Sequence, residues 1–341
     1  MKLLVIVDDH FSAIGLAASA RKSEELIEVL AANDYYTPFM LLKAIEERKP
    51  TTVFFAWRGA LLDILQCGWR PRRVFKKLNQ VSIGVLIPDL MGLETGAISQ
   101  ETQIIDLVDF YMVTSKELYS LYSFRFPKKP PSGLYRDLPN LALIESLKNE
   151  NLSARKQRVI WVGNSKWGVH QGAVDHKGMN EVVIPLRGKL RQNIDFCLID
   201  STEKRLPHEM VLREIRDSKV LIQTSKTEGT GLPLLEAAGL GTITITTDVG
   251  VASDFLQGEL QKLIVERSVE GFSAGIDYAF SNSTRLGKML EERFKTYVDE
   301  VSRDFIPQLP NTKTKDLSLF SVQLGLIIRI KWFRRWLLAR L

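Results

Sequence analysis

The chain alternates short, continuous apolar runs with longer stretches in which apolar residues recur at helical spacing. Runs this continuous are too apolar to be half-exposed strands, so we expect parallel sheets that are covered on both faces by helices. Four runs lie in each half of the sequence: KLLVIV (2–7), TTVFFAW (51–57), VSIGVLI (81–87), FYMVTS (110–115), RVIWVG (158–163), DFCLID (195–200), KVLIQTS (219–225) and TITITTD (242–248). This alternation predicts doubly wound α/β units.

Helical spacing is clear in SARKSEELIEVLAA (19–32), HEMVLREIRDS (208–218) and the long segment from residue 283 to 305. Proline and charged residues cluster between residues 127 and 157, where the first set of strands ends. We therefore predict a first Rossmann-like domain over residues 1–150 and a second over 151–310, followed by a basic, aromatic C-terminal helix over 311–341. Two such domains would face each other across a cleft at the carboxyl ends of their strands.

Composition narrows the class of protein. Only two cysteines occur among 341 residues, Cys67 and Cys197, and both lie in apolar surroundings, which favours reduced thiols in the cytosol. No apolar run is long enough to span a membrane, and the first one is too short for a signal peptide. The net charge is +6, but the segment after Asp316 carries five of those charges, which leaves +1 for the rest. Because the chain up to Asp316 is almost neutral, it lacks the excess of lysine and arginine that a nucleic-acid-binding domain needs.

The stretch from Ser225 to Gly250 carries the most specific chemistry. It follows a predicted buried strand, and its glycines and Pro233 predict a tight turn that leads into a helix. The free amides of Thr230, Gly231 and Leu232 would then suit a phosphate group. Glu228 beside them can only accept hydrogen bonds, which suits sugar hydroxyls. A second carboxylate, Glu236, is expected on the first helical turn, where it would accept from a ribose diol.

Together these groups predict a site for a sugar nucleotide. The alternative is an ordinary turn between a strand and a helix, in which Glu236 only compensates the helix dipole.

The segment EGTGLPLLEAAGLG (228–241) resembles the signature of two glutamates separated by seven residues that is typical of retaining GT-B glycosyltransferases, especially glycosyltransferase family 4. The resemblance implies that Glu228 and the following amides hold the donor sugar and that Glu236 holds the ribose. It also implies a GT-B fold and a front-face reaction in which the leaving phosphate takes the acceptor proton.

The resemblance extends along the second half of the chain. VIWVGNSKWG, followed by DHKGM, is similar to the family's glycine-ended strand and Lys-Gly pair, which implies that Lys177 grips the diphosphate and balances its charge. Gly163 and Asn164 occupy the adjacent donor-binding positions, but Asn164 stands where the family often has arginine, and Lys166 is a candidate for the missing charge. TTDVGVASDF resembles the family's Asp-x-Gly-Gly segment, with Val251 and Asp254 at positions where glycine and glutamate are usual.

In the first domain, polar residues follow three strands at the expected edge: Asp9 and His10, then Trp57 and Arg58, then Asp89. His10 and Asp89 are candidates to contact the sugar or the acceptor, although each is equally suited to a capping or loop role. Ser115 is expected to cap a helix. His170 and His176 are expected at the surface, and the chain lacks an Asp-x-Asp metal motif. We therefore predict a metal-independent site without a cofactor.

The tail LGLIIRIKWFRRWLLARL (324–341) mixes aromatic and basic residues, which suits an anionic membrane surface. The alternative is that it packs on the first domain. The sequence as a whole predicts a hexosyltransferase that moves a sugar from a nucleotide diphosphate onto a glycan or lipid-linked acceptor. We expect a role in polysaccharide biosynthesis and a peripheral location on the inner face of the plasma membrane. The rival prediction is an inactive glycosyltransferase-like subunit that steadies a partner.

Overall fold

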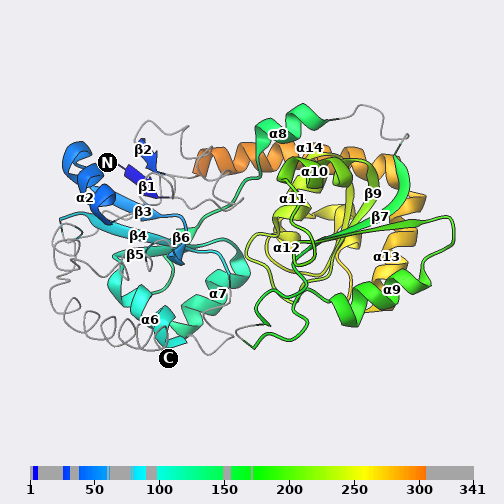
Figure 1. Cartoon of the computed structure of the whole chain (residues 1–341), viewed down its shortest axis with the longest axis horizontal. Helices are drawn as coiled ribbons and strands as arrows, with labels where there is room; N and C mark the ends of the chain where they lie inside the picture. Colours follow the sequence, from blue (N-terminus) through cyan, green and yellow to red (C-terminus); the bar gives the residue numbers. More distant parts are fainter. Residues whose placement is uncertain are drawn as a thin grey trace, which may run out of the picture.

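The computed structural model describes residues 3–6, 26–30, 38–59, 61, 78, 80–89, 98–148, 155–169 and 172–304. These residues form two domains that lie side by side, each built on a parallel sheet (Figure 1). All eight predicted strands are present, so the prediction of doubly wound parallel sheets is confirmed. His10, Cys67, His170 and the tail from residue 305 onward lie outside the described residues.

The first sheet has the strand order β2-β1-β3-β4-β5-β6, and every neighbouring pair is parallel. Its strands are β1 (Leu3–Ile6), β2 (Leu26–Leu30), β3 (Thr52–Phe55), β4 (Ser82–Ile87), β5 (Phe110–Val113) and β6 (Gly133–Leu134). The helices of this domain within the described ranges are α2 (Pro38–Arg48), α6 (Ile98–Leu107) and α7 (Lys116–Arg125). As predicted, Ser115 caps α7 and accepts a hydrogen bond from the amide of Leu118 at 3.2 Å.

The prediction of a helix over residues 19–32 is wrong at Leu26–Leu30, which forms the edge strand β2. The segment pairs in parallel with β1, so that Leu4 faces Glu28. Ile27 and Val29 are β-branched, and pairing with a neighbouring strand overrides the modest helical preference of the flanking residues.

The second sheet has the order β10-β9-β7-β8 and is also parallel throughout. Its strands are β7 (Lys156–Gly163), β8 (Asp195–Asp200), β9 (Ser218–Gln223) and β10 (Ile243–Thr246). One layer consists of the π-helical turn η3 (Met179–Val183), α9 (Ile184–Lys189) and α13 (Val269–Ser281). The other layer contains α8 (Leu141–Leu147), α10 (His208–Arg216), α11 (Leu232–Gly239) and the long helix α14 (Ser283–Asp304). Two short helices, α12 (Ala252–Phe255) and η4 (Gly258–Leu263), complete this domain.

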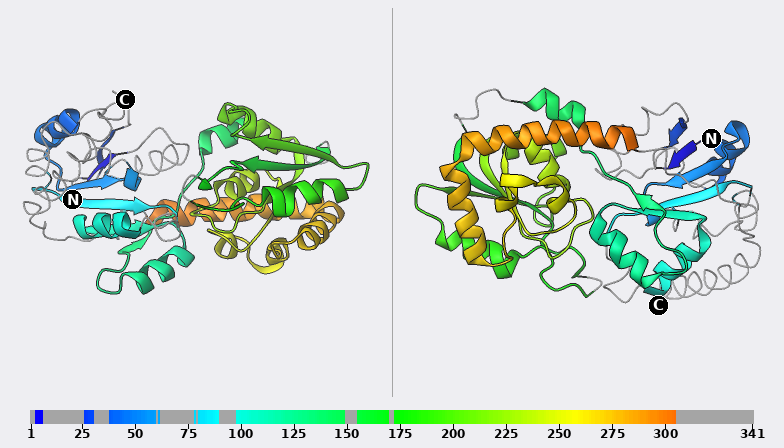
Figure 2. Two further views of the ribbon diagram at one scale, coloured as in Figure 1. Left: turned by 60° about the horizontal axis from the view of Figure 1, so that its bottom comes forward. Right: turned by 180° about the vertical axis from the view of Figure 1, so that it is seen from behind.

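Each domain has its own apolar core. The second core takes in Leu138, Ile144 and Leu147, which precede the boundary expected at residue 150. Figures 1 and 2 show α14 running along one side of the second domain toward the first, as the long helical pattern from residue 283 predicts. The chain that joins the domains lies against this helix, since the Tyr297 hydroxyl donates to the carbonyl of Asp137 at 3.4 Å.

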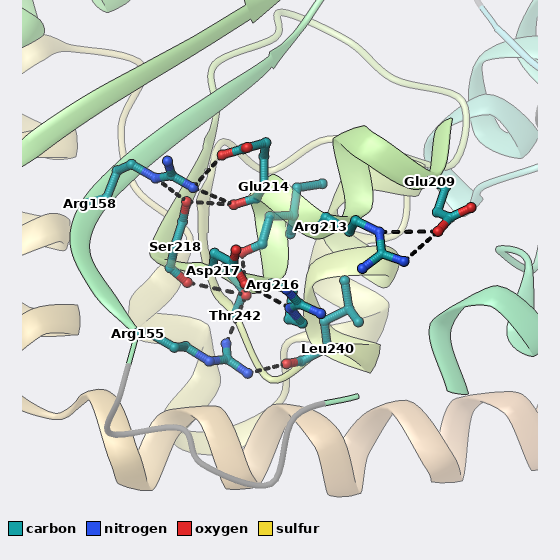
Figure 3. A network of polar contacts seen from close by, with 11 residues as sticks. Arg155, Arg158, Glu209, Arg213, Glu214, Arg216, Asp217, Ser218, Leu240 and Thr242 are labelled. Carbon is teal, nitrogen blue, oxygen red and sulfur yellow. Dashed lines mark hydrogen bonds and ion pairs between the residues drawn. The ribbon is translucent and has the colours of Figure 1, made fainter. Parts of the chain in front are cut away.

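A polar network closes the amino ends of the second sheet (Figure 3). The Arg158 guanidinium donates to Ser218 Oγ at 2.8 Å and to both the backbone carbonyl and the carboxylate of Glu214, at 3.0 and 2.7 Å. Arg155 donates to Thr242 Oγ1 at 2.8 Å and to the carbonyl of Leu240. Hydrogen bonds offset the cost of burying a charged group, so these contacts help to hold the end of the sheet that lies away from the candidate site, although Arg155 Nε has no partner among the described residues.

Candidate active site

The turn after β9 opens the candidate site. Gly231 is the N-cap of α11, and its φ of 81° lies in the left-handed region that glycine adopts at little cost. Pro233 lies in the first turn of the helix, as predicted. Among the described residues, the amides of Thr230, Gly231 and Leu232 donate to no protein group. They are therefore available at the positive end of the helix, where an anion is stabilised.

Lys177 and Glu228 meet beside this turn. The Lys177 ammonium forms an ion pair with Glu228 Oε1, and Ser225 Oγ donates to the same oxygen at 2.6 Å. Both side chains are largely buried, with exposed fractions of 16% and 18%. Thr224 fixes the approach of the two segments, because its hydroxyl accepts from the Trp161 indole at 3.1 Å and donates to the Lys177 carbonyl at 2.5 Å. The structure therefore brings together two residues that lie 51 positions apart in the sequence.

His176 adds a contact that the sequence analysis did not foresee. The expectation that it lies at the surface is wrong, because its side chain is buried and Nε2 lies 3.0 Å from the carbonyl of Thr227. Burial and the neighbouring Lys177 lower the pKa of His176, so the neutral ring donates to this carbonyl. The ring centroid of Trp167 lies 4.2 Å from that of His176, and the Lys177 ammonium lies 5.7 Å from the Trp167 ring. This packing supports the backbone next to Glu228.

The remaining donor-site predictions have local roles in the structure. Asn164 Oδ1 accepts from the amide of Lys166 at 3.0 Å and thereby closes the turn after β7. Lys166 is exposed on this turn, and no contact joins it to Lys177 or Glu228 among the described residues. A Cβ at Gly163 would lie 2.7 Å from the Trp161 ring, so glycine makes room there for the indole. Their predicted contacts with a donor stay predictions.

Glu236 lies in the second turn of α11 and not in the first, because the helix begins at Leu232. It is buried, and its Oε1 lies 2.7 Å from His208 Nε2 at the start of α10. Burial alone would lower the pKa of His208, but the hydrogen bond and the charge of Glu236 outweigh burial and raise it. The alternative, a carboxylate that only compensates the dipole in the first turn, does not fit this position.

The first domain contacts the turn directly. Gly229 packs so closely on the carbonyl of Pro88, at the end of β4, that a Cβ at this position would overlap it. Thr114 lies beside the same contact and donates to the Pro88 carbonyl at 3.3 Å. An ion pair between Lys116 of α7 and Asp254 of α12 also joins the two domains. Residues at the carboxyl ends of β4 and β5 therefore meet the loop that carries Glu228.

Asp89 follows Pro88 and belongs to a buried cluster of charges. The Arg58 guanidinium forms ion pairs with Asp89 and with Glu101, and the Tyr122 hydroxyl donates to Glu101 at 2.6 Å. Burial raises the pKa of Glu101 despite the nearby Arg58. Asp89 keeps a quarter of its side chain exposed, whereas Arg58 and Glu101 are almost fully covered. The structure therefore places Asp89 as the outermost member of the cluster, next to the contact between the domains.

Two further residues escaped the sequence analysis. His208 begins a segment whose helical spacing was recognised, but no pattern in the sequence indicates that it pairs with Glu236. Gln223, the last residue of β9, is buried beneath Gly231, and among the described residues its side-chain amide has no hydrogen-bond partner. Its place within a continuous apolar run was the available signal, because a polar residue inside such a run is unusual.

No group of three or more histidine, cysteine, aspartate or glutamate side chains within the described ranges is arranged to hold a metal ion. Of the predicted thiols, Cys197 is half-buried, and burial raises its pKa.

Comparison with known proteins places these observations in a family context. Residues 191–299, which include the Glu228 turn and Glu236, match the model of the family described as glycosyl transferases group 1. A comparison with curated protein sequences gives no match.

Solved structures resemble the whole fold. A sucrose-phosphate synthase from Thermosynechococcus elongatus is 14% identical with a TM-score of 0.58, covering 98% of this chain and 100% of its own. Anabaena HepE in complex with UDP and glucose is 8% identical with a TM-score of 0.59 and the same coverage. The chain spans only 60% of the matched chain of a GtfA/B complex, with 84% of this chain covered, 13% identity and a TM-score of 0.48.

At this level of identity the solved structures establish only the fold. The family match concerns residues 191–299, which lie in the second domain. The chain thus has the GT-B fold of glycosyltransferases, and residues 191–299 in its second domain match the group 1 family model.

Proposed function

We propose that the protein is a retaining glycosyltransferase that moves a sugar from a nucleotide diphosphate sugar onto a hydroxyl of a glycan or lipid-linked acceptor. The observation that carries this proposal is that Lys177 and Glu228 meet beside the N-terminus of α11. There the amides of Thr230, Gly231 and Leu232 donate to no protein group among the described residues. These groups form one cluster with a cation, a carboxylate and aligned N–H donors. A diphosphate binds to the cation and to the N–H donors, and sugar hydroxyls donate to the carboxylate.

The chain's own residues would divide the work as follows. The Lys177 ammonium exchanges its contact with Glu228 for the diphosphate and balances the charge that develops on the leaving phosphate. The α11 amides hold the same group. Glu228, released from Lys177 but still bonded to Ser225, accepts hydrogen bonds from the donor sugar and fixes its orientation. The resemblance to retaining enzymes supports front-face attack, in which the leaving phosphate itself accepts the proton of the acceptor hydroxyl.

The first domain supplies the acceptor side in this proposal. Asp89 lies next to Pro88, which touches Gly229, so it is close to the donor turn and partly exposed. Its ion pair with Arg58 orients the carboxylate, which suits a hydrogen bond from an acceptor hydroxyl. Near the sugar nucleotide, Glu236 and His208 form a hydrogen-bonded pair that would contact the ribose diol. In that contact the carboxylate accepts hydrogen bonds and the imidazole donates one. Anabaena HepE holds UDP in a similar fold, so UDP-sugars are the first donors to test.

The test combines turnover with the stereochemistry of the product. Glu228→Gln should keep the fold and lower transfer at least about a hundredfold, as the loss of a pre-placed polar group in a buried site commonly does. Glu209→Gln, on the exposed face of α10, is the matched control and should be neutral. NMR of the first product formed should show the anomeric configuration of the donor. Near-normal turnover of Glu228→Gln, or an inverted product, would contradict the proposal.

A second function is favoured by one observation. Lys177 is already paired with Glu228, and Glu236 with His208. Asn164 stands where arginine is usual. The charged groups of the site thus have partners within the protein without a ligand, which is also compatible with an inactive binding subunit. Release of nucleotide from a panel of UDP-, GDP- and ADP-sugars separates the two functions. Slow release that Lys177→Ala abolishes supports the enzyme, and binding without any release supports the subunit.

We also propose that the basic, aromatic tail brings the enzyme to an anionic membrane, where a lipid-linked acceptor for a cell-surface polysaccharide would be available. No helix within the described ranges is both long and apolar enough to cross a bilayer. Deleting the chain from about Gly325 should weaken binding to anionic vesicles and leave turnover on a soluble acceptor analogue. If the truncated protein unfolds or loses that turnover, the tail belongs to the fold instead.

A further inference from the structure

Arg267 lies outside the motifs recognised in the sequence, but its side chain reaches the candidate site. It precedes Ser268, the N-cap of α13. Nε of its guanidinium donates to the backbone carbonyl of Thr224, just after β9, at 2.9 Å, and Nη2 donates to the carbonyl of Asp175 at 2.9 Å. Nη1 forms an ion pair with Glu181 in η3. One side chain thus joins three segments that lie 43, 92 and 86 residues away in the sequence.

The three partners of Arg267 surround the loop that carries Lys177. Asp175 lies two residues before Lys177, and Glu181 lies four residues after it. Thr224 donates its hydroxyl to the Lys177 carbonyl at 2.5 Å. The Asp175 carboxylate also accepts from the Glu181 amide at 2.8 Å, which ties the start of the loop to η3. Arg267 therefore connects both sides of this loop with the end of β9.

The backbone of this loop adopts conformations that need support. Asp175 has a φ of 41° and Gly178 a φ of 73°, both in the left-handed region. A residue with a Cβ persists in such a conformation only where its surroundings hold it. A Cβ at Gly178 would lie 2.7 Å from the Thr224 carbonyl oxygen and 3.1 Å from Arg267 Nη2, so the loop packs closely on both. The conformation that presents Lys177 thus depends on contacts from outside the loop.

The guanidinium of Arg267 suits this place by its shape. It offers several N–H donors in one fixed plane, which match two carbonyls and a carboxylate at once, whereas a lysine ammonium is a compact point charge. The hydrogen bond from Arg267 lowers the pKa of Glu181, so a carboxylate faces the guanidinium at neutral pH. The positive charge of Arg267 is therefore largely balanced within the protein, and its contribution to the site is one of position.

We propose that Arg267 is a positioning residue for the donor diphosphate. It holds the loop that carries Lys177 against the end of β9, so that the ammonium stays beside the turn before α11 when it exchanges Glu228 for the diphosphate. It acts through Lys177 and touches no reacting atom. This inference rests on the proposed function, because it takes the diphosphate as the ligand of Lys177.

The test compares binding of a nucleoside diphosphate and of its nucleoside to the full-length protein by calorimetry. The nucleotide is UDP, GDP or ADP, whichever the parent binds most tightly. Arg267→Gln should weaken diphosphate binding about tenfold and leave nucleoside binding unchanged. Arg267→Lys should resemble Arg267→Gln, because an ammonium keeps the charge but cannot span the three acceptors. Parent affinity in Arg267→Lys would overturn the proposal, since charge alone would then suffice.

A double-mutant cycle shows whether Arg267 acts through Lys177. In the Lys177→Ala background, Arg267→Gln should cause almost no further loss of diphosphate affinity, and the same loss in both backgrounds would overturn the proposal. Arg158→Ala, at the opposite end of the sheet, controls for a general loss of stability. Arg285→Ala, whose ion pair with Glu259 lies at the start of α14, controls for the loss of a positive charge. Both controls should bind the diphosphate like the parent, and a loss in either that equals the loss in Arg267→Gln would assign Arg267 a structural role only.

The outcomes also separate this inference from the proposed function. If Lys177→Ala weakens diphosphate binding and Arg267→Gln does not, the positioning role alone is wrong. If Lys177→Ala binds the diphosphate like the parent, the role of Lys177 in the proposed function fails, and the positioning role fails with it.

Discussion

The two ends of the second sheet use polar residues in opposite ways. At the amino ends, the guanidinium groups of Arg155 and Arg158 bind backbone carbonyls and hydroxyls of the chain itself. At the carboxyl ends, the amides of Thr230 to Leu232 donate to no protein group among the described residues, and the Gln223 amide has no hydrogen-bond partner there. The first arrangement stabilises the fold, and the second leaves hydrogen-bonding capacity for a ligand. Substitutions at the two ends should therefore separate stability from activity.

The largest effect is expected at the domain contact. Gly229→Ala places a methyl group against the Pro88 carbonyl, so the loop that carries Glu228 must move away from the first domain. Because small displacements of reacting groups are costly, kcat/KM should fall about a hundredfold or more while nucleotide binding by the second domain changes little. Gly188→Ala, where the added group meets nothing within 4 Å, is the control. Normal kinetics in Gly229→Ala would show that the domain contact is not the active arrangement.

Lys177→Ala should weaken binding of a nucleoside diphosphate about tenfold to a hundredfold, which is the usual contribution of a charged hydrogen bond. Binding of the nucleoside alone should hardly change, since only the diphosphate meets the ammonium. Calorimetry with UDP and uridine measures both. Equal losses for the two ligands would mean that Lys177 acts through Glu228 and the shape of the turn, and Lys189→Ala on α9 controls for the general loss of charge.

At the amino ends the effect should appear in stability. Arg158→Ala removes the guanidinium that donates to Ser218 Oγ, to the Glu214 carbonyl and to the Glu214 carboxylate, and only the bond from Ser218 Oγ to that carbonyl remains. The substitution should lower the free energy of unfolding by about 2–4 kcal/mol in urea titrations. Arg213→Ala, whose exposed ion pair with Glu209 lies on the surface of α10, should cost less than about 0.5 kcal/mol. Nucleotide affinity should be unchanged in both. A drop in affinity without a drop in stability in Arg158→Ala would break the division between the two ends.

The pair of His208 and Glu236 should give a smaller, pH-dependent contribution. The folded-state pKa of His208 is raised above its usual 6.5, so the folded state holds the proton more tightly than the unfolded one. The pair therefore stabilises the fold fully below that usual value, and the contribution is lost as the pH rises through the raised pKa. In His208→Gln this part of the slope of stability against pH should vanish. An identical slope in both proteins would show that His208 is neutral throughout.

The smallest expected effect is that of chelation. Lys177 and the α11 amides offer positive charge to the diphosphate without a metal ion, so transfer should be the same with and without EDTA. Loss of activity in EDTA that manganese or magnesium restores would contradict this division of labour.

The sequence was sufficient for the sheets because buried parallel strands are continuous apolar runs, and all eight predicted runs are strands. It failed at Leu26–Leu30, where an edge strand carries enough polar residues to look helical. The Glu228 turn was predictable because its residue types indicate local structure: glycine favours a tight turn, and proline favours the first turn of a helix. The contacts of Glu228 with Lys177, and of Glu236 with His208, join segments 51 and 28 residues apart, and local patterns do not record such pairings.

Charge and burial also misled in specific cases. His176 was expected at the surface because two histidines without cysteines or acidic partners nearby are more often surface residues. The indole of Trp167 instead packs on its buried ring. For α7 the sequence predicted only the cap, Ser115, and it did not indicate which apolar residues of the helix are buried. Only the three-dimensional packing separates Leu118 and Tyr122 from the exposed Phe124.

The contact of Gly229 with Pro88 has a consequence at the level of the gene. Every single-nucleotide missense change of a glycine codon introduces a residue with a Cβ, and any Cβ at position 229 meets the Pro88 carbonyl. In a saturation library selected for transfer activity, codon 229 should therefore tolerate only synonymous changes. A homologue that keeps glutamate at position 228 but has a larger residue after it must hold its two domains in another arrangement, and one codon is then enough to recognise such homologues in genomic data.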